Sequence, residues 1–162
     1  MIFTSEIQFK NYLRTMSKTE FQPGSIYRYE STVPAAVDDQ NGHVNNVAYV
    51  QWMQDVAILH SDSAGGTRAM DAAGVTWVVR SHKIEYLSPA FAGDRIDAFT
   101  WVVNFRRVRS LRRYKFVRKS DNMLLARGET DWVFVDAASR RPRAIPPDVS
   151  CAFPLVPEDQ EP

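Results

Sequence analysis

A short polar segment directly before an apolar stretch carries the residue types needed to attack a carbonyl group. Residues 37–52 read VDDQNGHVNNVAYVQW, so a carboxylate at Asp39, an amide at Asn41 and an imidazole at His43 precede a run of apolar side chains. A helix that begins there would offer backbone N–H groups and a partial positive charge to a developing oxyanion. A carboxylate beside such amides either attacks the carbonyl carbon or takes a proton from water. The segment therefore predicts acyl-transfer chemistry.

The same segment also has a structural interpretation. Asn45 or Asn46 is an expected N-cap for the following helix, and Gly42 is expected to have a positive φ. His43 either donates a hydrogen bond to a carbonyl, orients Asp39, or serves the loop alone. Each residue taken singly fits a loop or cap, whereas the combination favours chemistry.

The elements that must position this segment are a buried helix and a set of antiparallel strands. Residues 47–60 lack Gly and Pro and are apolar on nearly all sides, which predicts a helix inside the core. A short helix closed by Gly74 is expected after it. Including that short helix, the other expected elements cover residues 26–33, 67–73, 76–86, 97–108, 111–119 and 124–136. This order predicts an α+β fold in which a curved antiparallel β-sheet wraps around one long central helix.

Alternation within two expected strands predicts which side chains face the same way. In residues 97–108 the apolar side chains at Phe99, Trp101, Val103 and Phe105 are expected to share one face. In residues 124–136 the side chains at even positions, among them Trp132 and Phe134, are expected to lie opposite charged ones at odd positions. One face of the sheet is therefore expected to be covered and the other to be partly polar.

Length and composition predict one globular domain with two accessory ends. The chain has 162 residues, 44% of them hydrophobic, and a net charge of +1, so bulk charge indicates no particular partner. Residues 1–24 are expected to be an accessory segment, residues 25–146 the domain, and residues 147–162 a flexible, Pro-rich, acidic tail. The single cysteine, Cys151, excludes an internal disulfide. With neither a secretory signal nor a membrane-spanning stretch in the sequence, we expect a cytoplasmic protein.

The polar segment resembles a known family signature. Residues 39–49 read DQNGHVNNVAY, which is similar to the D-x-x-G-H-V-N-N-x-x-Y signature of hotdog-fold acyl-CoA thioesterases, and most similar to the 4-hydroxybenzoyl-CoA thioesterase branch. The resemblance extends over roughly residues 25–146 and includes YLSPA at 86–90 and WVFVD at 132–136. It implies the hotdog fold and hydrolysis of an acyl-CoA to a carboxylic acid and free CoA.

The resemblance also implies roles for single residues. Asp39 matches the catalytic aspartate of the family, and the backbone N–H at or near Asn46 matches its oxyanion donor. Asn41 and His43 match the Asn-x-His of the related plant acyl-carrier-protein thioesterases, where they bind and polarise the thioester. No cofactor is expected, because CoA is part of the substrate. A homodimer or homotetramer is implied, with each active site built across the dimer interface.

An arginine-rich run later in the chain is the expected contact for the nucleotide end of CoA. Eight basic residues and no acidic ones fall between Arg106 and Lys119. Arginine suits bidentate contacts with phosphate, although solvated strand faces also carry arginines. The candidates are Arg107, Arg109, Arg112 and Arg113.

Several alternatives stay open at this point. Asp55, inside the helix, is a second and weaker catalytic candidate, since another hotdog branch carries its catalytic Glu on the central helix. Cys151 lies far from the motif, which argues against a thiol nucleophile. A hotdog hydratase or dehydratase would pair His43 with Asp39. A non-catalytic module would bind acyl-CoA, or RNA through the arginine-rich strands. No metal site is expected, because the three histidines show no ligand spacing.

Overall fold

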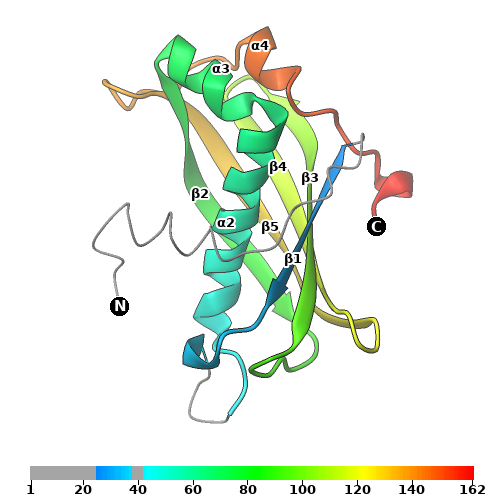
Figure 1. Cartoon of the computed structure of the whole chain (residues 1–162). Helices are drawn as coiled ribbons and strands as arrows, with labels where there is room; N and C mark the ends of the chain where they lie inside the picture. Colours follow the sequence, from blue (N-terminus) through cyan, green and yellow to red (C-terminus); the bar gives the residue numbers. More distant parts are fainter. Residues whose placement is uncertain (1–24, 38–41) are drawn as a thin grey trace.

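A curved antiparallel sheet wraps around the long helix α2 (Asn46–Ala64) in the computed structural model, which describes residues 25–37 and 42–162 (Figure 1). Two short helices, α3 (Gly66–Ala73) and α4 (Pro147–Ser150), lie at the end where α2 finishes. The strands are β1 (Ile26–Thr32), β2 (Val75–Tyr86), β3 (Arg95–Arg106), β4 (Arg109–Arg118) and β5 (Met123–Asp136). Short 3-10 turns occupy Ala35–Val37 and Glu158–Gln160. Each helix and strand predicted after residue 25 is present, and the predicted α+β arrangement is confirmed.

The strand order is β1-β3-β4-β5-β2, and every pair is antiparallel. The sheet therefore has two distinct ends. The end that contains Thr32, Arg95 and Tyr86 lies beside the start of α2, and we call it the loop end. The opposite end contains Val75 and the turn between β3 and β4, and we call it the turn end.

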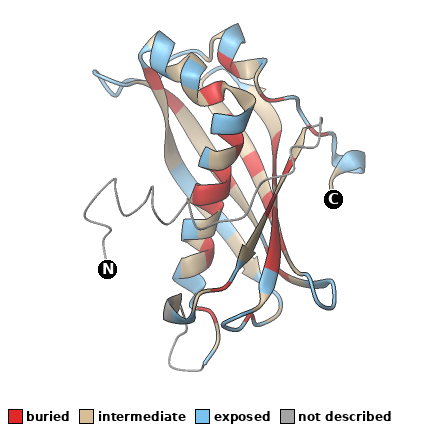
Figure 2. Cartoon of the chain, viewed as in Figure 1, coloured by how far each residue is buried: buried red, intermediate tan, exposed pale blue. Residues whose placement is uncertain are grey.

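Helix α2 packs against the sheet mainly through apolar side chains, with Asp55, His60 and Ser61 as its buried polar residues. Met53 and Val56 are fully buried, and Figure 2 shows buried segments along α2 between intermediate and exposed ones. Gly128 in β5 permits the close approach, since a Cβ at this position would lie 2.9 Å from Sδ of Met53. A helix of this composition is stable only when packed on most sides, which explains why it lies in the hollow of the sheet.

The predicted face assignment for β3 is wrong, whereas that for β5 is confirmed. The pairing of β3 with β4 shifts register between Val102 and Asn104. Before this bulge the even positions face α2, so Ile96 is in the core while Trp101 lies on the outer face. After it Phe105 turns inward and lies near Trp77, with ring centroids 6.4 Å apart. An extra residue in one strand reverses its alternation, and strict period-two counting overlooks it.

The C-terminal residues pack on the sheet, contrary to the flexible tail expected for residues 147–162. Val149, Phe153 and Val156 are buried, and the backbone N–H of Val156 donates to the carbonyl of Val102 at 3.0 Å. The side chain of Glu161 accepts a hydrogen bond from Nη1 of Arg113 at 2.6 Å. The Pro and acidic content suggested a solvated tail, but three spaced apolar residues are enough to dock the segment.

Candidate active site

The start of α2 presents an open backbone donor. Asn45 is the N-cap, with φ −62° and ψ 136°, and its Oδ1 accepts from the backbone N–H of Val47 at 2.9 Å. Gly42 has the expected positive φ of 76°. Among the described residues, none accepts a hydrogen bond from the backbone N–H of Asn46. Because Asn45 caps the next amide, the Asn46 N–H is the donor that remains available to a ligand.

Hydrogen bonds tie this helix start to the neighbouring strands. The backbone N–H of Val44 donates to the carbonyl of Ala90 at 2.8 Å, and that of Asn45 donates to Val37 at 2.8 Å. The hydroxyl of Tyr86 donates to the carbonyl of Asn46 at 3.1 Å. The Asn46 amide is therefore held in place before any ligand arrives, which is the arrangement that favours oxyanion stabilisation.

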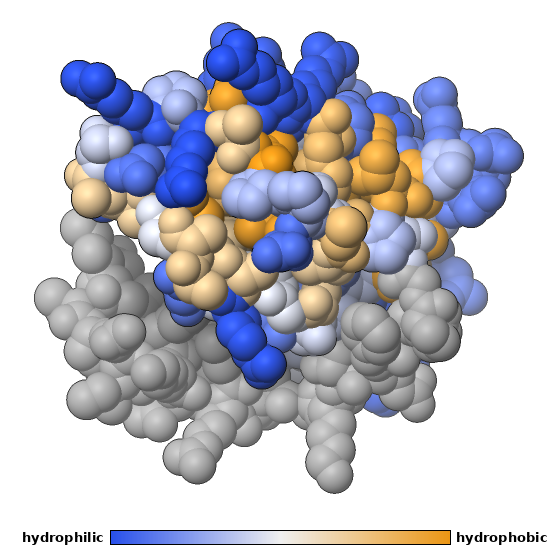
Figure 3. All heavy atoms as spheres, turned by 90° about the horizontal axis from the view of Figure 1, so that it is seen from above, coloured by the Kyte–Doolittle hydropathy of each residue, from blue (hydrophilic) through white to orange (hydrophobic). Residues whose placement is uncertain are grey.

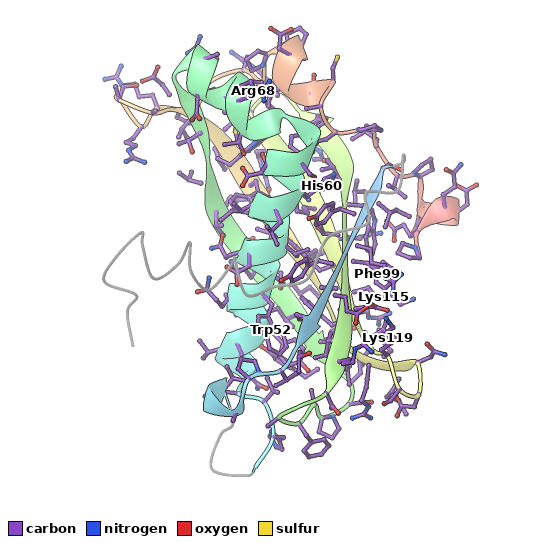
Figure 4. All side chains as sticks on the ribbon, in the orientation of Figure 1. Trp52, His60, Arg68, Phe99, Lys115 and Lys119 are labelled. Carbon is purple, nitrogen blue, oxygen red and sulfur yellow. The ribbon has the colours of Figure 1, made fainter. Side chains whose placement is uncertain are left out.

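An aromatic cluster supports the first turns of α2 from below. Tyr49 is buried and meets the rings of Trp52, Tyr86 and Phe116 edge-on, at centroid distances of 4.9, 5.5 and 5.5 Å. Burial raises the pKa of Tyr49 to about 12, so its phenol stays neutral. Figure 4 shows Trp52 in the lower half of α2, where this cluster lies. The tyrosine of the motif therefore has a packing role.

The polar loop itself is only partly described. Asp39 and Asn41 lie outside the described residues, so their predicted roles stay predictions. His43 is half-buried and directly precedes Val44, whose backbone is anchored to Ala90.

The second carboxylate candidate, Asp55, faces a different part of the molecule. Its Oδ1 accepts from Nε2 of Gln51 at 2.8 Å, while Oδ2 is buried with no partner among the described residues. It lines a space of about 10 Å³ together with Tyr29 and Ile96, on the β1 side of α2. Burial raises the pKa of Asp55. A space of this size has no room for a thioester, which favours a structural position for Asp55.

We expect Asp55→Asn to stabilise the protein at neutral pH. Folding raises the pKa of Asp55, so the folded protein holds the proton more tightly than the unfolded chain. The free energy of unfolding that this proton contributes is lost as the pH rises from near 3.8 through the folded pKa. The asparagine cannot ionise, so the free energy of unfolding should be higher than that of the wild type at pH 7, and the gain should vanish near pH 3. Urea unfolding of both proteins across this pH range measures the difference. A gain that does not depend on pH would contradict the explanation.

An aromatic cavity lies under the second half of α2, at the turn end of the sheet. Its volume is about 320 Å³, and its walls include Ile58, Trp77, Phe105, Trp132 and Phe153. Seen from this end, apolar side chains reach the surface between hydrophilic ones (Figure 3). A concave, mainly apolar site with a few polar groups is the usual form of a small-molecule pocket. Sequence reasoning missed this cavity because its walls come from α2, α3, several strands and the C-terminal segment.

His60 is buried beside this cavity. Its Nδ1 lies 2.8 Å from Nη1 of Arg112, and its ring stacks on Tyr27 with centroids 5.2 Å apart. Burial, and then the charge of Arg112, lower the pKa of His60 to about 3. His60 is therefore neutral, and Nδ1 accepts the hydrogen bond from Arg112. Figure 4 places His60 in the upper half of α2.

Stability should fall as the pH drops below the ordinary pKa of histidine. Between about pH 6.5 and pH 3 the unfolded chain binds a proton at His60 that the folded protein does not. The wild type should lose about 2 kcal/mol of unfolding free energy between pH 7 and pH 5 through this group. Chemical denaturation of wild type and His60→Gln at both pH values checks this, since glutamine keeps an acceptor for Arg112 but does not titrate. Equal pH dependence in the two proteins would refute it.

The arginine-rich run is largely neutralised by acids from the neighbouring strand β5 and from the C-terminal segment. Nε of Arg109 donates to Oδ1 of Asp131 at 3.1 Å, and Nη1 of Arg113 donates to Oε1 of Glu161 at 2.6 Å. Arg109 and Arg113 therefore have counter-charges within the chain, although the run itself contains no acid. In an antiparallel sheet the nearest charges belong to adjacent strands, not to sequence neighbours.

Of the other two candidate arginines, one is exposed to solvent and the other is buried. Arg107 is exposed in the turn between β3 and β4 and forms no ion pair with the described residues. Arg112 faces inward and lines the aromatic cavity. Arg112 is therefore poorly placed for a phosphate at the surface, and the nucleotide contact remains a prediction for Arg107, Arg109 and Arg113.

Within one chain, the predicted catalytic loop and the predicted nucleotide contacts do not meet. The loop joins α2 at the loop end, whereas Arg107 and the aromatic cavity lie at the turn end. The 12 residues of β3 run between the two ends, a distance of roughly 35 Å. One copy of the chain therefore places the pieces of the predicted site apart.

The described residues show neither a metal centre nor a membrane helix. Within residues 25–37 and 42–162, no group of three or more His, Cys, Asp or Glu side chains is arranged to hold a metal ion. In the same residues no helix is long and apolar enough to cross a membrane.

Sequence comparison relates the chain to thioesterases. The profile of the thioesterase-like superfamily matches residues 33–153. The acyl-CoA thioester hydrolase YbgC of Escherichia coli O157:H7 is 28% identical over 139 residues, which cover 85% of this chain and 98% of that protein. The same protein from Shigella flexneri matches equally well.

Solved structures share the fold. A 1,4-dihydroxy-2-naphthoyl-CoA thioesterase from Synechocystis superposes with a TM-score of 0.71 at 20% identity, covering 79% of this chain and 95% of that one. A Staphylococcus aureus protein in complex with CoA superposes with a TM-score of 0.72 at 17% identity, covering 83% of this chain and 85% of that one. The hotdog fold implied by the sequence motif is confirmed.

Proposed function

This chain belongs to the thioesterase-like superfamily, and we propose that it hydrolyses an acyl-CoA thioester to a carboxylic acid and free CoA. The observation that carries the proposal is the open N–H of Asn46 at the anchored start of a buried helix, a few residues after Asp39. The similarity of this chain to an acyl-CoA thioester hydrolase, over 85% of its length, supports the same activity.

In the proposed reaction the thioester carbonyl oxygen accepts a hydrogen bond from the Asn46 N–H. The carboxylate of Asp39 attacks the carbonyl carbon, or removes a proton from the water that attacks it. Negative charge develops on the carbonyl oxygen, where the helix start stabilises it. The C–S bond then breaks and CoA leaves as the thiolate. If Asp39 acts as the base, the proton that it took from water passes to the thiolate and the carboxylic acid is released. If Asp39 attacks, water then hydrolyses the acyl anhydride on Asp39, which releases the acid and supplies the proton of the thiol. Asn41 and His43 bind and polarise the thioester in this scheme.

We propose that a second copy of the chain completes the site. Strand β2 is an edge of the sheet with 12 residues, and an edge of this length offers backbone groups to another strand. Antiparallel pairing of two β2 strands about a two-fold axis would place the turn end of one copy beside the loop end of the other. The aromatic cavity of one protomer would then face the Asp39 loop of its partner, with Arg107 at the same end. The assembly would be a homodimer or a pair of dimers.

The activity is tested with purified protein, a panel of aromatic and aliphatic acyl-CoAs, and a dye that traps the released thiol. Release of CoA with formation of the free acid supports the proposal. A change in enoyl absorbance without thiol release would instead indicate a hydratase. Saturable binding of acyl-CoA without turnover would indicate a non-catalytic module. Either of the last two results would overturn the assignment.

A further inference from the structure

A buried arginine forms part of the wall of the aromatic cavity. Arg112 is 6% exposed, projects from the inner face of β4, and its guanidinium carbon lies 5.4 Å from the ring centre of Phe153. Removing a guanidinium from water costs free energy that an anion or several acceptors must offset. The surroundings of Arg112 therefore indicate what the cavity is built to receive.

The partners of Arg112 among the described residues are all neutral. Its Nη1 contacts Nδ1 of His60 at 2.8 Å and Oγ1 of Thr100 at 3.2 Å. Within the described part of the chain no carboxylate forms an ion pair with Arg112, whereas Arg109, Arg113 and Arg118 on the same strand each have one. The positive charge of Arg112 is thus left without a counter-charge from residues 25–37 and 42–162.

The unused atoms of Arg112 form the edge that suits a carboxylate. Both hydrogen bonds to the guanidinium involve Nη1, and Nε and Nη2 have no acceptor among the described residues. Neither Nε nor Nη2 is among the described side-chain atoms that are fully buried without a hydrogen-bond partner. Because Arg112 lines the cavity, both atoms are accessible from it. Nε and Nη2 point in parallel, and this fork matches the two oxygens of a carboxylate.

The rest of the cavity wall agrees with a ligand that is apolar in the middle and anionic at its far end. Trp77, Phe105 and Trp132 provide apolar and aromatic surface. The acidic lining residue is Asp62, which is exposed and accepts from the hydroxyl of Thr67 at 2.6 Å. Asp62 therefore lies toward the solvent, where its charge is screened.

We propose that the cavity binds an acyl group that ends in a carboxylate, and that Nε and Nη2 of Arg112 hold this carboxylate. The inference rests on the proposed thioesterase function, because it assigns the acyl group of the same substrate. It makes Arg112 a specificity-determining residue, distinct from the groups at the helix start that act on the thioester.

The first test compares matched thioesters. Each ω-carboxyacyl-CoA in a series of chain lengths is paired with a methyl-terminated acyl-CoA of the same length. For the best length, wild type should favour the carboxylate by about 10- to 100-fold in kcat/KM, the effect of a charge-assisted hydrogen-bond pair. Arg112→Met, of similar length but uncharged, should reverse this preference. Arg127→Gln, which removes an outer-face arginine paired with Glu85, should leave it unchanged.

The second test measures binding without turnover and separates failure of this inference from failure of the proposed function. Calorimetry should detect saturable binding of adipate, but not of the uncharged hexane-1,6-diol, to wild type, and Arg112→Met should lose it. Adipate binding without hydrolysis of any thioester would contradict the proposed function but keep the site. Hydrolysis at equal rates for both members of every pair would mean that the Arg112 edge is only hydrated, and would overturn the inference. If Arg112→Met does not fold, the preference of the wild type for ω-carboxyacyl-CoA over methyl-terminated acyl-CoA still decides whether the inference holds.

Discussion

Asp39→Asn is expected to lower kcat for acyl-CoA hydrolysis by about 10²–10⁴, the usual contribution of one acid–base or nucleophilic group. Asparagine has nearly the same shape as aspartate but neither attacks a carbonyl carbon nor accepts a proton from water at neutral pH. The Asn46 N–H is unaffected, so residual activity from oxyanion stabilisation should remain. KM should change little, because the carboxylate is assigned to the chemical step. Steady-state release of CoA measures both constants.

Two matched substitutions make this test specific. Asp38→Asn changes the adjacent carboxylate by the same atoms and should keep kcat within a few-fold. Asp55→Asn changes the buried helix carboxylate, which lies on the β1 side of α2 away from the cavity. Full activity of Asp39→Asn together with a large loss in Asp55→Asn would transfer the catalytic role to Asp55. Equal losses in Asp38→Asn and Asp39→Asn would point to a general effect of loop charge.

Phe116→Ala is expected to lower the free energy of unfolding by about 3–5 kcal/mol, the range for removing a buried Phe side chain. Phe116 is 0% exposed and lies beneath Tyr49 and Trp52, at centroid distances of 5.5 and 6.1 Å. Its removal leaves a space that a helix tied at its start by backbone hydrogen bonds cannot easily close. The aromatic cluster also supports the turn that presents the Asn46 amide, so kcat should fall as well.

Urea unfolding measures the effect, and Phe91→Ala is the matched control. Phe91 is 44% exposed, so the same truncation there should cost less than about 1 kcal/mol. A loss below this value for Phe116→Ala would show that α2 repacks on the sheet freely. The helix start would then have to be held chiefly by the hydrogen bonds of Val44 and Asn45.

The arginine run shows that the order of charges along the sequence does not reveal which charges form ion pairs in the folded protein. Residues 106–119 contain no acid, yet Arg109 and Arg113 pair with Asp131 and Glu161. Both partners are distant in sequence. Asp131 belongs to the adjacent strand β5, and Glu161 belongs to the C-terminal segment, which lies on the outer face of the sheet. Arg112 is the arginine of β4 that has no counter-charge among the described residues. It points inward, and only the strand register determines which way it points.

By itself the sequence determined the parts of this protein that depend on neighbouring residues. A helix cap at Asn45 or Asn46, the positive φ of Gly42, the long helix and the strands follow from local hydrogen bonding and hydrophobic periodicity, and the structure places the cap at Asn45. The motif at residues 39–49 likewise indicates the fold family, because its loop and cap residues lie close together in the sequence.

The tertiary structure alone decided everything that depends on contacts between distant segments. The bulge between Val102 and Asn104 reversed the faces of β3, and the C-terminal segment docked through residues such as Phe153. The aromatic cavity, and the unpaired edge of Arg112 inside it, exist only when one helix, several strands and that segment come together. Register and packing are long-range properties, so no local pattern encodes them.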